Sequence, residues 1–443
     1  MDKRIKQYSA TLQSMIQFET ISSEENNDVE KFRKFHKLLK KNFPNVFSKC
    51  EIEDYEGSLL IRWPGNNSER PVMFMNHQDV VEATGEWKYP PFAGKLKDGI
   101  LWGRGTIDTK GGLFAMLQAA DELINDGFVP EQDIYFESGA NEEQGGAGAK
   151  HFAELLKKNN IRFEYLIDEG GMVVEEPMNG VFGKYAMIGL GERGRAALLF
   201  TAKSNGGHAS TPGKDTPLVR LGKMMAYIDK HNIFDVQIND AVVQMLKSFS
   251  YSMEDNTKYI YRYANIFKPL LKLLMPNSSP TAKAMVATTI AFTMAEGSGE
   301  ANVLPESAYI VGDMRISHHE GFEKAFARVK ETAAKFDVQV DVLEEAVESN
   351  VASLDSYGFK LASEAVEKVF NTGDEKVIVA PYIMNQGSDA RFFSDVCDTC
   401  LRFAPLSIDS HLLETVHGVN ERIDVYCLDN AVDFYKYMMT NTK

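Results

Sequence analysis

Short apolar runs alternate with longer amphipathic stretches between residues 50 and 190 of this 443-residue chain. The runs PVMFMNH, DIYFESGA and EYLIDEGG have strand length, and each predicts a buried strand that ends at a polar loop. The stretch GGLFAMLQAADELINDG has helical spacing and ends at Gly127, a typical helix stop. The segment before about Phe47 predicts two amphipathic helices. Such alternation favours an α/β fold with a mixed, mostly parallel sheet flanked by helices.

A different order of elements begins after residue 190. The stretches RAALLFTAK, MVATTIAFTMAEG, ESAYIVGDMRIS and VQVDVLEEAV predict strands, and TPLVRLGKMMAYIDK and HEGFEKAFARVKETAAKF predict helices. In chain order they give β-α-β-β-α-β, which is a split βαβ unit. We therefore expect a catalytic domain over 1–190 and 349–443, and an inserted α+β lid domain over 191–348.

The predicted lid contains an extra stretch between residues 230 and 283. It includes NTKYIYRYANIFKPLLKLLMPN, in which aromatic and leucine residues alternate with four cations. These cations are Lys258, Arg262, Lys268 and Lys272. One interpretation is a helix that lies on a membrane surface. The interpretation that the sequence favours is packing on the lid, or a cover over an apolar substrate pocket.

The composition of the chain excludes some classes of binding partner and favours others. The net charge of −15 and the pI near 5.2 disfavour nucleic acid, because binding to phosphates needs a cationic face. The N-terminal stretch MDKRIKQYSATLQSMIQF lacks the apolar centre of a signal peptide. No apolar run reaches the length of about 18 residues that predicts a membrane span. We expect a cytoplasmic protein without a membrane partner that acts on a small molecule.

The four cysteines are Cys50, Cys397, Cys400 and Cys427. Cys397 and Cys400 form a C-x-x-C pair, but a redox motif would open a helix of a thioredoxin-like unit. A zinc site would need two more ligands nearby. Neither context is evident, so we predict structural or incidental thiols in a reducing compartment.

Imidazole and carboxylate groups follow the predicted strands in an order that suits metal ions. The candidate ligands are His77, Asp108, Glu143, Asp168 and His417. Zinc binds His nitrogen and carboxylate oxygen, and a catalytic site keeps a position open for water. Two ions that share one water need a bridging carboxylate, and Asp108 in its Gly-rich loop suits that role. His77 and Asp168 would complete one site, and Glu143 and His417 the other.

Two further acidic residues have candidate catalytic roles. Glu142 stands beside a ligand and is the candidate general base, which would move a proton from the attacking water to the leaving amine. Asp79 lies two residues after His77, so its carboxylate could hydrogen-bond the imidazole and fix its tautomer. A single acidic residue is usually a solvated surface group. The joint pattern at three predicted strand ends therefore carries the prediction.

The motifs resemble a known family. The matching stretches are NHQDVV, WGRGTIDTKGG, NEEQGG, LIDEGG, GGHAS, ANVLPE, DMRIS, GSDAR and HGVNERI, which span Asn76 to Ile423. The chain resembles the di-zinc metallohydrolases that include aminoacylase, carboxypeptidase G, acetylornithine deacetylase and succinyl-diaminopimelate desuccinylase. Its large central region is similar to the carboxypeptidase S branch.

The resemblance implies roles that spacing alone does not assign. His208 would polarise the scissile carbonyl, often across a dimer formed through the lid, and the Asp108–Thr109 peptide would be cis. Four residues would bind the substrate: Asn302 and Arg315, which hold its carboxylate, and Gly387 and Ser388. Two positions depart from the pattern, because Asn76 and Asn141 replace the usual Gly and Asp. These changes remove no ligand but could alter hydrogen bonds around the metals.

Together these observations predict a hydrolase with two Zn²⁺ ions, for which Co²⁺ or Mn²⁺ could substitute. It would cleave the amide bond of a peptide or N-acyl amino acid next to a free carboxylate. An aminopeptidase or dipeptidase on the same scaffold is the nearest alternative, and it would need an acidic group for the substrate ammonium. A metal-stabilised binding protein without turnover is a further alternative, which an intact Glu142 disfavours.

Overall fold

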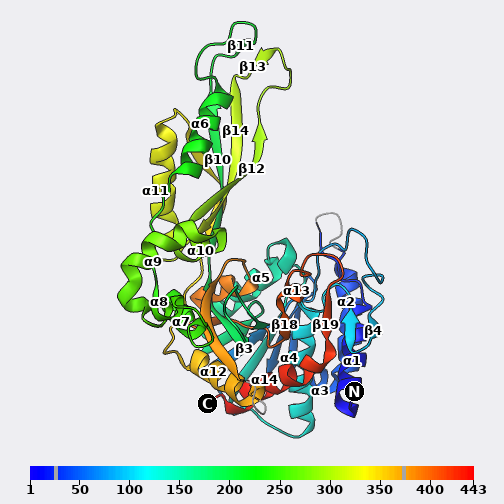
Figure 1. Cartoon of the computed structure of the whole chain (residues 1–443). Helices are drawn as coiled ribbons and strands as arrows, with labels where there is room; N and C mark the ends of the chain where they lie inside the picture. Colours follow the sequence, from blue (N-terminus) through cyan, green and yellow to red (C-terminus); the bar gives the residue numbers. More distant parts are fainter. Residues whose placement is uncertain (24–27, 372–375) are drawn as a thin grey trace.

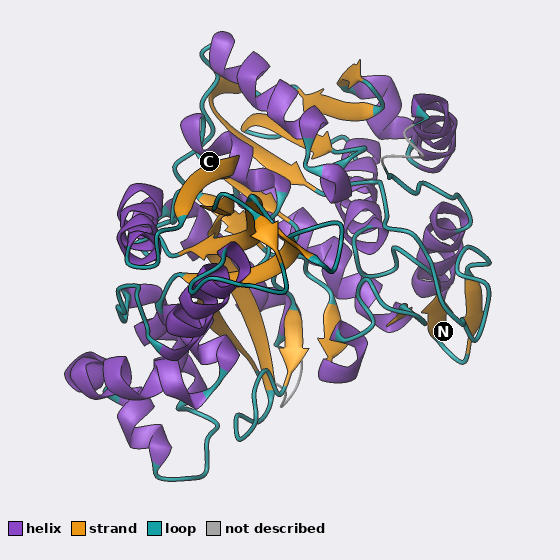
Figure 2. Cartoon of the chain, turned by 90° about the horizontal axis from the view of Figure 1, so that it is seen from above, coloured by secondary structure: helices purple, strands orange, loops and turns teal. Residues whose placement is uncertain are grey.

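The computed structural model describes residues 1–23, 28–371 and 376–443. Figure 1 shows a broad lower body that holds both termini, and a narrow upper part that extends from it. Figure 2 shows that helices surround the strands of the body. This arrangement agrees with the α/β class that the sequence predicts.

The body is built on a ten-stranded sheet in the order β1-β2-β6-β3-β7-β17-β9-β8-β18, with β16 paired to β9. Its strands are β1 Glu51–Tyr55, β2 Ser58–Trp63, β3 Asn67–Met75, β6 Gln132–Ser138, β7 Tyr165–Asp168, β8 Val173–Glu175, β9 Lys184–Glu192, β16 Val377–Met384, β17 Cys400–Arg402 and β18 Ser407–Asp409. The central pairs β6–β3, β3–β7 and β7–β17 are parallel. The predicted mixed sheet is therefore confirmed. A small separate sheet contains β4 Lys95–Lys97, β5 Ile100–Trp102 and β19 Arg422–Asp424.

Helices cover both faces of the main sheet. They are α1 Lys3–Ile16, α2 Val29–Asn42, α3 Pro44–Lys49, α4 Lys110–Asn125, α5 Ala147–Lys158, α12 Tyr357–Phe370, α13 Ser410–Leu413 and α14 Leu428–Asn441, with the 3-10 turns η1 Glu142–Gln144, η2 Asp389–Asp395 and η3 Val425–Cys427. The largest core cluster joins α1, α4, α12 and α14 to one face of the sheet, and α5 and η2 pack on the other. The N-terminal segment forms α1 and α2 as predicted, together with the short α3.

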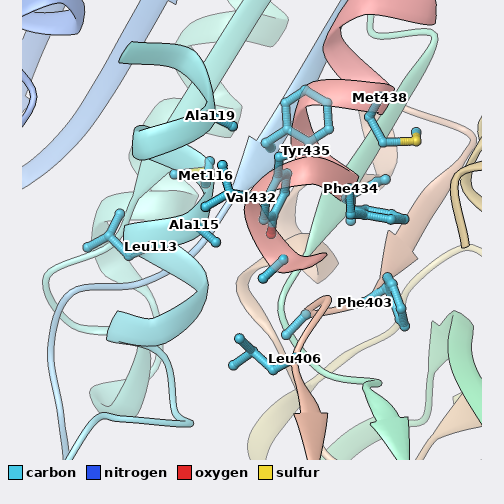
Figure 3. Packing of buried hydrophobic residues seen from close by; sticks show 14 of the residues in the cluster. Leu113, Ala115, Met116, Ala119, Phe403, Leu406, Val432, Phe434, Tyr435 and Met438 are labelled. Atoms are coloured by element: carbon cyan, nitrogen blue, oxygen red, sulfur yellow. The ribbon is translucent and has the colours of Figure 1, made fainter. Parts of the chain in front are cut away.

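Helix α4 is buried along most of its length, although its sequence predicts an amphipathic helix. The burial comes from tertiary packing, because α1, α3 and α14 also contact this helix. Figure 3 shows Met116 and Ala119 of α4 on the side that faces Val432 and Tyr435 of α14. This packing fixes the helix that begins two residues after Asp108.

The upper part contains a four-stranded antiparallel sheet in the order β12-β14-β10-β15. Its elements are β10 Gly194–Lys203, α6 Pro217–Lys230, β12 Thr289–Glu296, β14 Ser307–Ile316, α11 Gly321–Ala334 and β15 Gln339–Val347. They confirm the predicted β-α-β-β-α-β order, and α6 and α11 pack on one face of the sheet. The short strands β11 Gly207–His208 and β13 Val303–Leu304 pair at its far end (Figure 1).

The extra stretch forms a group of helices beside the body. These are α7 Asp240–Phe249, α8 Thr257–Arg262, α9 Ala264–Ser278 and α10 Pro280–Val286. Their core includes Val242, Leu246 and Leu271, and it contacts Tyr185 of β9 and Ala380 of β16. The favoured interpretation of packing on the lid is thus corrected, since these helices pack on strands of the main sheet.

All four cysteines are free thiols. Cys397 and Cys400 are buried in the apolar cluster under α5, where each Sγ hydrogen-bonds a backbone carbonyl. Burial raises the pKa of the Cys397 thiol well above its ordinary value. A buried protonated thiol is a poor nucleophile and metal ligand, which agrees with the predicted structural role.

Candidate metal centre

Three of the predicted ligand groups follow strands that are neighbours in the sheet. His77 lies two residues after β3, Glu142 and Glu143 form η1 after β6, and Asp168 ends β7. Strands β6, β3 and β7 are adjacent and parallel. Their carboxyl ends therefore meet at one edge, where sites form in open α/β sheets.

Asp108 lies between the two candidate histidines. Its Oδ1 is 3.0 Å from His77 Nε2, and its Oδ2 is 3.0 Å from His417 Nε2. His417 Nε2 is also 3.2 Å from Glu143 Oε1. One ligand atom each from His77, Asp108 and Glu143 lie within 4.8 Å of one another. The structure thus brings together four of the five predicted ligands, with Asp108 in the central position.

Hydrogen bonds connect the imidazole and carboxylate groups of this cluster. Hydrogen bonds with Asp108 and then Glu143 raise the pKa of His417 to about 10. Burial lowers the pKa of His77, but hydrogen bonds with Asp108 and Asp79 outweigh it and raise that pKa well above its ordinary value. Burial opposes ionisation of Asp108, yet the two histidines keep its pKa below its usual range. A dication would take the place of these protons, because metal ligands must be deprotonated.

Buried carboxylates beside the cluster also fit bound cations. Burial, followed by the charge of Asp168, raises the pKa of Glu137 well above its usual range. Burial and the charge of Glu137 do the same for Asp389. Neither carboxylate oxygen of Asp389 has a hydrogen-bond partner in the described part of the chain. Such an excess of buried acid is costly without a nearby positive charge, which metal ions would supply.

The fifth predicted ligand, Asp168, lies in a loop that offers two carboxylates. Its Oδ1 accepts a hydrogen bond from the backbone N–H of Glu169, and its Oδ2 accepts one from Ala390, each at 2.8 Å. The pKa of Glu169 is raised well above its usual range by burial and then by the charge of Asp108. The charges of Glu169 and Asp108 therefore interact, which makes Glu169 a further candidate ligand. Sequence reasoning missed Glu169, although it stands in the same LIDEGG motif.

Asp79 connects His77 to the turn that carries Glu142 and Glu143. Its carboxylate accepts hydrogen bonds from the backbone N–H groups of Glu142 and Glu143, each at 3.2 Å, and from the hydroxyl of Ser22. Its Oδ1 is 3.3 Å from His77 Nδ1, whose closest acceptor is the backbone carbonyl of Asp79 at 3.0 Å. Asp79 thus orients a ligand and the candidate base together.

Glu142 has the electrostatic setting of a general base. Its pKa is raised well above the usual range by burial first, and by Asp389 and Glu143, while His77 acts in the opposite direction. A carboxyl with a raised pKa can both accept and return a proton near neutral pH. These charges agree with a proton shuttle, and the role of Glu142 stays a prediction.

A buried glutamate that sequence reasoning missed shapes the Asp108 loop. Glu421 accepts hydrogen bonds from the backbone N–H groups of Gly105, Ile107 and Asp108, at 3.0, 2.8 and 3.2 Å. It also pairs with Arg104 at 2.8 Å. Glu421 stands four residues after His417. Its hydrogen bonds therefore hold the loop of Asp108 and the loop of His417 together. The Asp108–Thr109 peptide in this loop is cis, as the resemblance implies.

The two departures from the family pattern have defined partners. Asn76 is fully buried, and its Nδ2 donates to the Tyr435 hydroxyl at 3.1 Å. Its Oδ1 accepts from the hydroxyl of Thr109 at 3.2 Å, next to Asp108. Asn141 Oδ1 accepts from the backbone N–H of Gly148 at the start of α5. Both residues therefore position ligand loops through hydrogen bonds.

The predicted binding loop at Gly387 and Ser388 is held by a buried ion pair. Glu192, at the end of β9, accepts from the backbone N–H and the hydroxyl of Ser388, both at 3.0 Å. The same carboxylate is 3.1 Å from Nη2 of Arg402, whose side chain is fully buried. A Cβ at Gly387 would lie 2.5 Å from Arg391 Nη1, so a larger residue there would displace the end of the Arg391 side chain. Neither Glu192 nor Arg402 was identified from the sequence.

The predicted substrate residues of the lid lie apart from the metal cluster. His208 belongs to β11 and Asn302 precedes β13, at the far end of the upper part (Figure 1). His208 Nδ1 is hydrogen-bonded to Ser210 at 2.8 Å, and the carbonyl of Asn302 accepts from Ala209. Arg315 lies near the other end of β14, where Nε pairs with Asp313 at 2.8 Å. The single chain therefore does not bring His208 and Asn302 to the candidate ligands.

His and carboxylate groups gather at the carboxyl edge of the parallel strands of the mixed sheet, an arrangement that suits a metal-dependent hydrolase. The chain belongs to the family described as "Peptidase family M20/M25/M40", which matches residues 73–441. A "Probable carboxypeptidase S-like 2" of Dictyostelium discoideum is 28% identical, over 96% of this chain and 83% of the relative. The human "N-fatty-acyl-amino acid synthase/hydrolase PM20D1" is 29% identical, over 97% and 86%.

A solved structure agrees with the fold. The M20 family metallo-carboxypeptidase Sso-CP2 from Sulfolobus solfataricus superimposes with a TM-score of 0.69 and 18% identity, over 99% of both chains. The resemblance to the metallohydrolase family and to its carboxypeptidase S branch is thus confirmed.

Proposed function

We propose that this enzyme uses two metal ions to cleave the amide bond of a peptide or N-acyl amino acid beside a free carboxylate. The observation that carries the proposal is the position of Asp108 between His77 and His417, with Glu143 at 3.2 Å from the second histidine. Two imidazoles on opposite oxygens of one carboxylate fit a bridged pair of ions. Zinc suits these donors, and Co²⁺ or Mn²⁺ could replace it.

The proposed ligands divide between two sites. His77 and a carboxylate of the Asp168–Glu169 loop would hold one ion, Glu143 and His417 would hold the other, and Asp108 would join them. When bound, such ions polarise a carbonyl and lower the pKa of water. The hydrogen bond between Asp79 and Nδ1 of His77 fixes the orientation of the imidazole. The other ring nitrogen, Nε2, would then coordinate the ion.

Glu142 is proposed as the group that moves the proton. It would accept a proton from the attacking water and pass it to the amide nitrogen as the C–N bond breaks. Its raised pKa supports this assignment, because the carboxyl must hold the proton between the two steps. His208 of the lid would donate to the oxygen of the scissile carbonyl as negative charge develops there.

Arg315, Asn302, Gly387 and Ser388 are proposed to bind the substrate. The planar guanidinium of Arg315 can bind a carboxylate through two hydrogen bonds, and Asn302 would add a polar contact. The name of the human relative concerns N-fatty-acyl amino acids, so a long acyl chain is one substrate class that we propose for this chain.

We further propose that the lid domain of 191–348 forms a homodimer. The open face of its sheet exposes Met294 and Leu343, whose exposed fractions are 60% and 53%. A second subunit would cover these side chains. It would also supply His208 and Asn302 to a cluster that the same chain does not bring them to.

A substrate panel on the metal-loaded enzyme tests the proposed function. It should contain N-acyl amino acids with short and long acyl chains, dipeptides, and the same compounds with the carboxylate amidated. We expect turnover of free carboxylates only, and a Glu142→Gln variant that keeps its metal but loses about 10²–10⁴-fold in kcat. Glu154→Gln, at an exposed glutamate of α5, is the matched control. Equal turnover of amidated substrates, or near-normal activity of Glu142→Gln, would refute the proposal.

A further inference from the structure

Helix α9 has a second apolar face that is turned to solvent. Its inner face, with Ala264, Leu271 and Met275, is buried in the core shared with β9 and β16. A stripe at helical spacing remains exposed on the outside. Its members and their exposed fractions are Tyr263 53%, Ile266 74%, Leu270 38%, Leu273 68% and Leu274 50%. A surface helix normally has one apolar face and one polar face, so the outer stripe needs a separate explanation.

The segment that carries this stripe has a charge opposite to that of the whole molecule, and two acidic residues, Glu254 and Asp255, lie just before it. Residues 256–283 contain five cations and no Asp or Glu, in a chain whose net charge is −15. The cations are Lys258, Arg262, Lys268, Lys272 and Lys283. Within the described part of the chain, Lys268 is the one member with an acidic partner at ion-pair distance, Asp240 at 3.2 Å. Arg262 and Lys272 are exposed.

From this stripe and its flanking cations, we propose that α8 and α9 bind an anionic lipid surface. Leucine and isoleucine side chains would enter the boundary between headgroups and acyl chains, while Arg262 and Lys272 contact lipid phosphates. Tyr259 and Tyr263, about half exposed at 50% and 53%, have the amphipathic rings that favour this interface.

The shape of the segment agrees with binding on the surface of a bilayer. Helix α9 has 15 residues, whereas a membrane-spanning helix needs about 20. Among the described residues, none of the helices combines the length and the apolar character needed to cross a membrane. Figure 1 shows α8 and α9 at the outer flank of the molecule, beside the junction of its two parts.

Charge also favours lipid over a second copy of this chain. A two-fold contact through the stripe would place the same cations of both copies near each other, and 256–283 has no acidic side chain to pair with them. An anionic surface satisfies both the cations and the apolar side chains. The proposal does not depend on the reaction, because lipid binding is measured without substrate.

Co-sedimentation with vesicles tests the proposal on the full chain. The vesicles contain phosphatidylcholine alone, or phosphatidylcholine with phosphatidylglycerol. We expect the wild type to sediment with the anionic vesicles, and binding to weaken as salt is raised. Arg262→Gln with Lys272→Gln should lower the partition coefficient about 25-fold, because each basic residue near such a surface contributes about 1 kcal/mol, or about fivefold. Ile266→Asp with Leu273→Asp should remove binding.

Matched controls separate this surface from general effects of charge and apolarity. Lys150→Gln with Lys158→Gln removes two exposed cations from α5, and Val129→Asp changes an apolar side chain with an exposed fraction of 56%. Both should bind as the wild type does. The proposal fails if the wild type stays in the supernatant with anionic vesicles at low salt, or if the controls lose as much binding as the α9 variants. It also fails if sedimentation velocity shows a dimer that Ile266→Asp with Leu273→Asp dissociates, since the stripe is then a subunit contact.

Discussion

At the scale of single residues, the loop after β7 offers two carboxylates, Asp168 and Glu169, as candidate metal ligands. Asp168 already accepts backbone hydrogen bonds from Glu169 and Ala390. No described residue hydrogen-bonds the side chain of Glu169, whose pKa is raised by burial and by Asp108. A carboxylate without other partners gains most from a cation. We therefore expect Glu169 to contribute more to metal affinity than Asp168.

Paired substitutions test this difference. Glu169→Gln should weaken the affinity for the less tightly held ion by at least about tenfold, because it removes a direct ligand. Asp168→Asn should have the smaller effect on affinity and a larger effect on stability, since it disturbs the loop. Competition with a chelator measures the first quantity, and urea unfolding of the metal-free protein measures the second. The reverse order of metal affinities would assign the ligand role to Asp168.

His318 gives the metal-free protein a defined dependence on pH. Burial first, and then the charges of Arg402 and Arg193, lower the pKa of His318 to about 4, while a hydrogen bond with the backbone at Ser349 acts in the opposite direction. Its pKa in the unfolded chain is about 6.5. Between these values the unfolded state binds the proton and the folded state does not. The free energy of unfolding therefore falls as pH decreases from about 6.5 to about 4.

The contribution of His318 is measured as a difference between variants. The wild type should lose up to about 3 kcal/mol more than His318→Gln over this pH interval. Urea unfolding with a chelator present keeps the metal ligands out of the comparison. His411→Gln, at an exposed histidine, should follow the wild type. Parallel pH profiles for wild type and His318→Gln would contradict the assignment.

The sequence predicted the members of the candidate metal cluster better than the residues that position them. His77, Asp108, Glu143 and His417 were predictable because imidazole and carboxylate groups at strand ends have few other uses in combination. Glu421 and Glu192 were not, because a buried acidic residue looks the same in sequence as one at the surface. Their roles depend on contacts with loops that lie 314 and 196 residues away in the chain. Those contacts exist only in the folded protein.

At the scale of elements, Glu192 joins the strands that enter and leave the upper part. Its backbone N–H donates to the hydroxyl of Ser349, which follows β15, and that hydroxyl donates to the Glu192 carbonyl. Its carboxylate holds Ser388 and Arg402. One residue therefore connects the base of the predicted lid to the candidate binding loop at Ser388 and to β17.

Removing this carboxylate should be strongly destabilising. Glu192→Gln leaves Arg402 buried without a counter-ion, which typically costs about 3–5 kcal/mol. Ser388→Ala removes one neutral hydrogen-bond partner and should cost about 1 kcal/mol. Urea unfolding of the metal-free variants compares the two. If both variants lose the same small amount, the ion pair does not anchor this junction.

Regular periodicity made most elements predictable, and long-range packing explains the exceptions. The strands that carry ligands and the split βαβ order follow from local patterns of apolar residues. Helix α4 is buried on more sides than its amphipathic sequence pattern predicts, because other helices cover it. Helices α7 and α9 were expected on the lid, but their inner faces complement β9 and β16 instead. Sequence periodicity shows that a face is apolar and does not show what covers it.

At the scale of the whole molecule, the separation of His208 from the metal cluster decides how the site is completed. His208 lies at the far end of the upper part, whereas Glu142 follows β6 in the body (Figure 1). If the second subunit of a dimer supplies the histidine, each active site contains Glu142 of one chain and His208 of the other. If the lid bends onto its own body, both residues come from the same chain.

Mixing two inactive variants distinguishes these arrangements. Glu142→Gln and His208→Ala should each be nearly inactive alone. Refolded together in equal amounts, they form heterodimers in which one of the two sites pairs an intact Glu142 with an intact His208. Half of the dimers would be mixed, so about one quarter of wild-type activity should return. Sedimentation velocity should show dimers throughout, and a mixture of Glu142→Gln with wild-type chain controls for exchange. No recovery from a mixture that demonstrably contains heterodimers would place His208 and Glu142 of each site on the same chain.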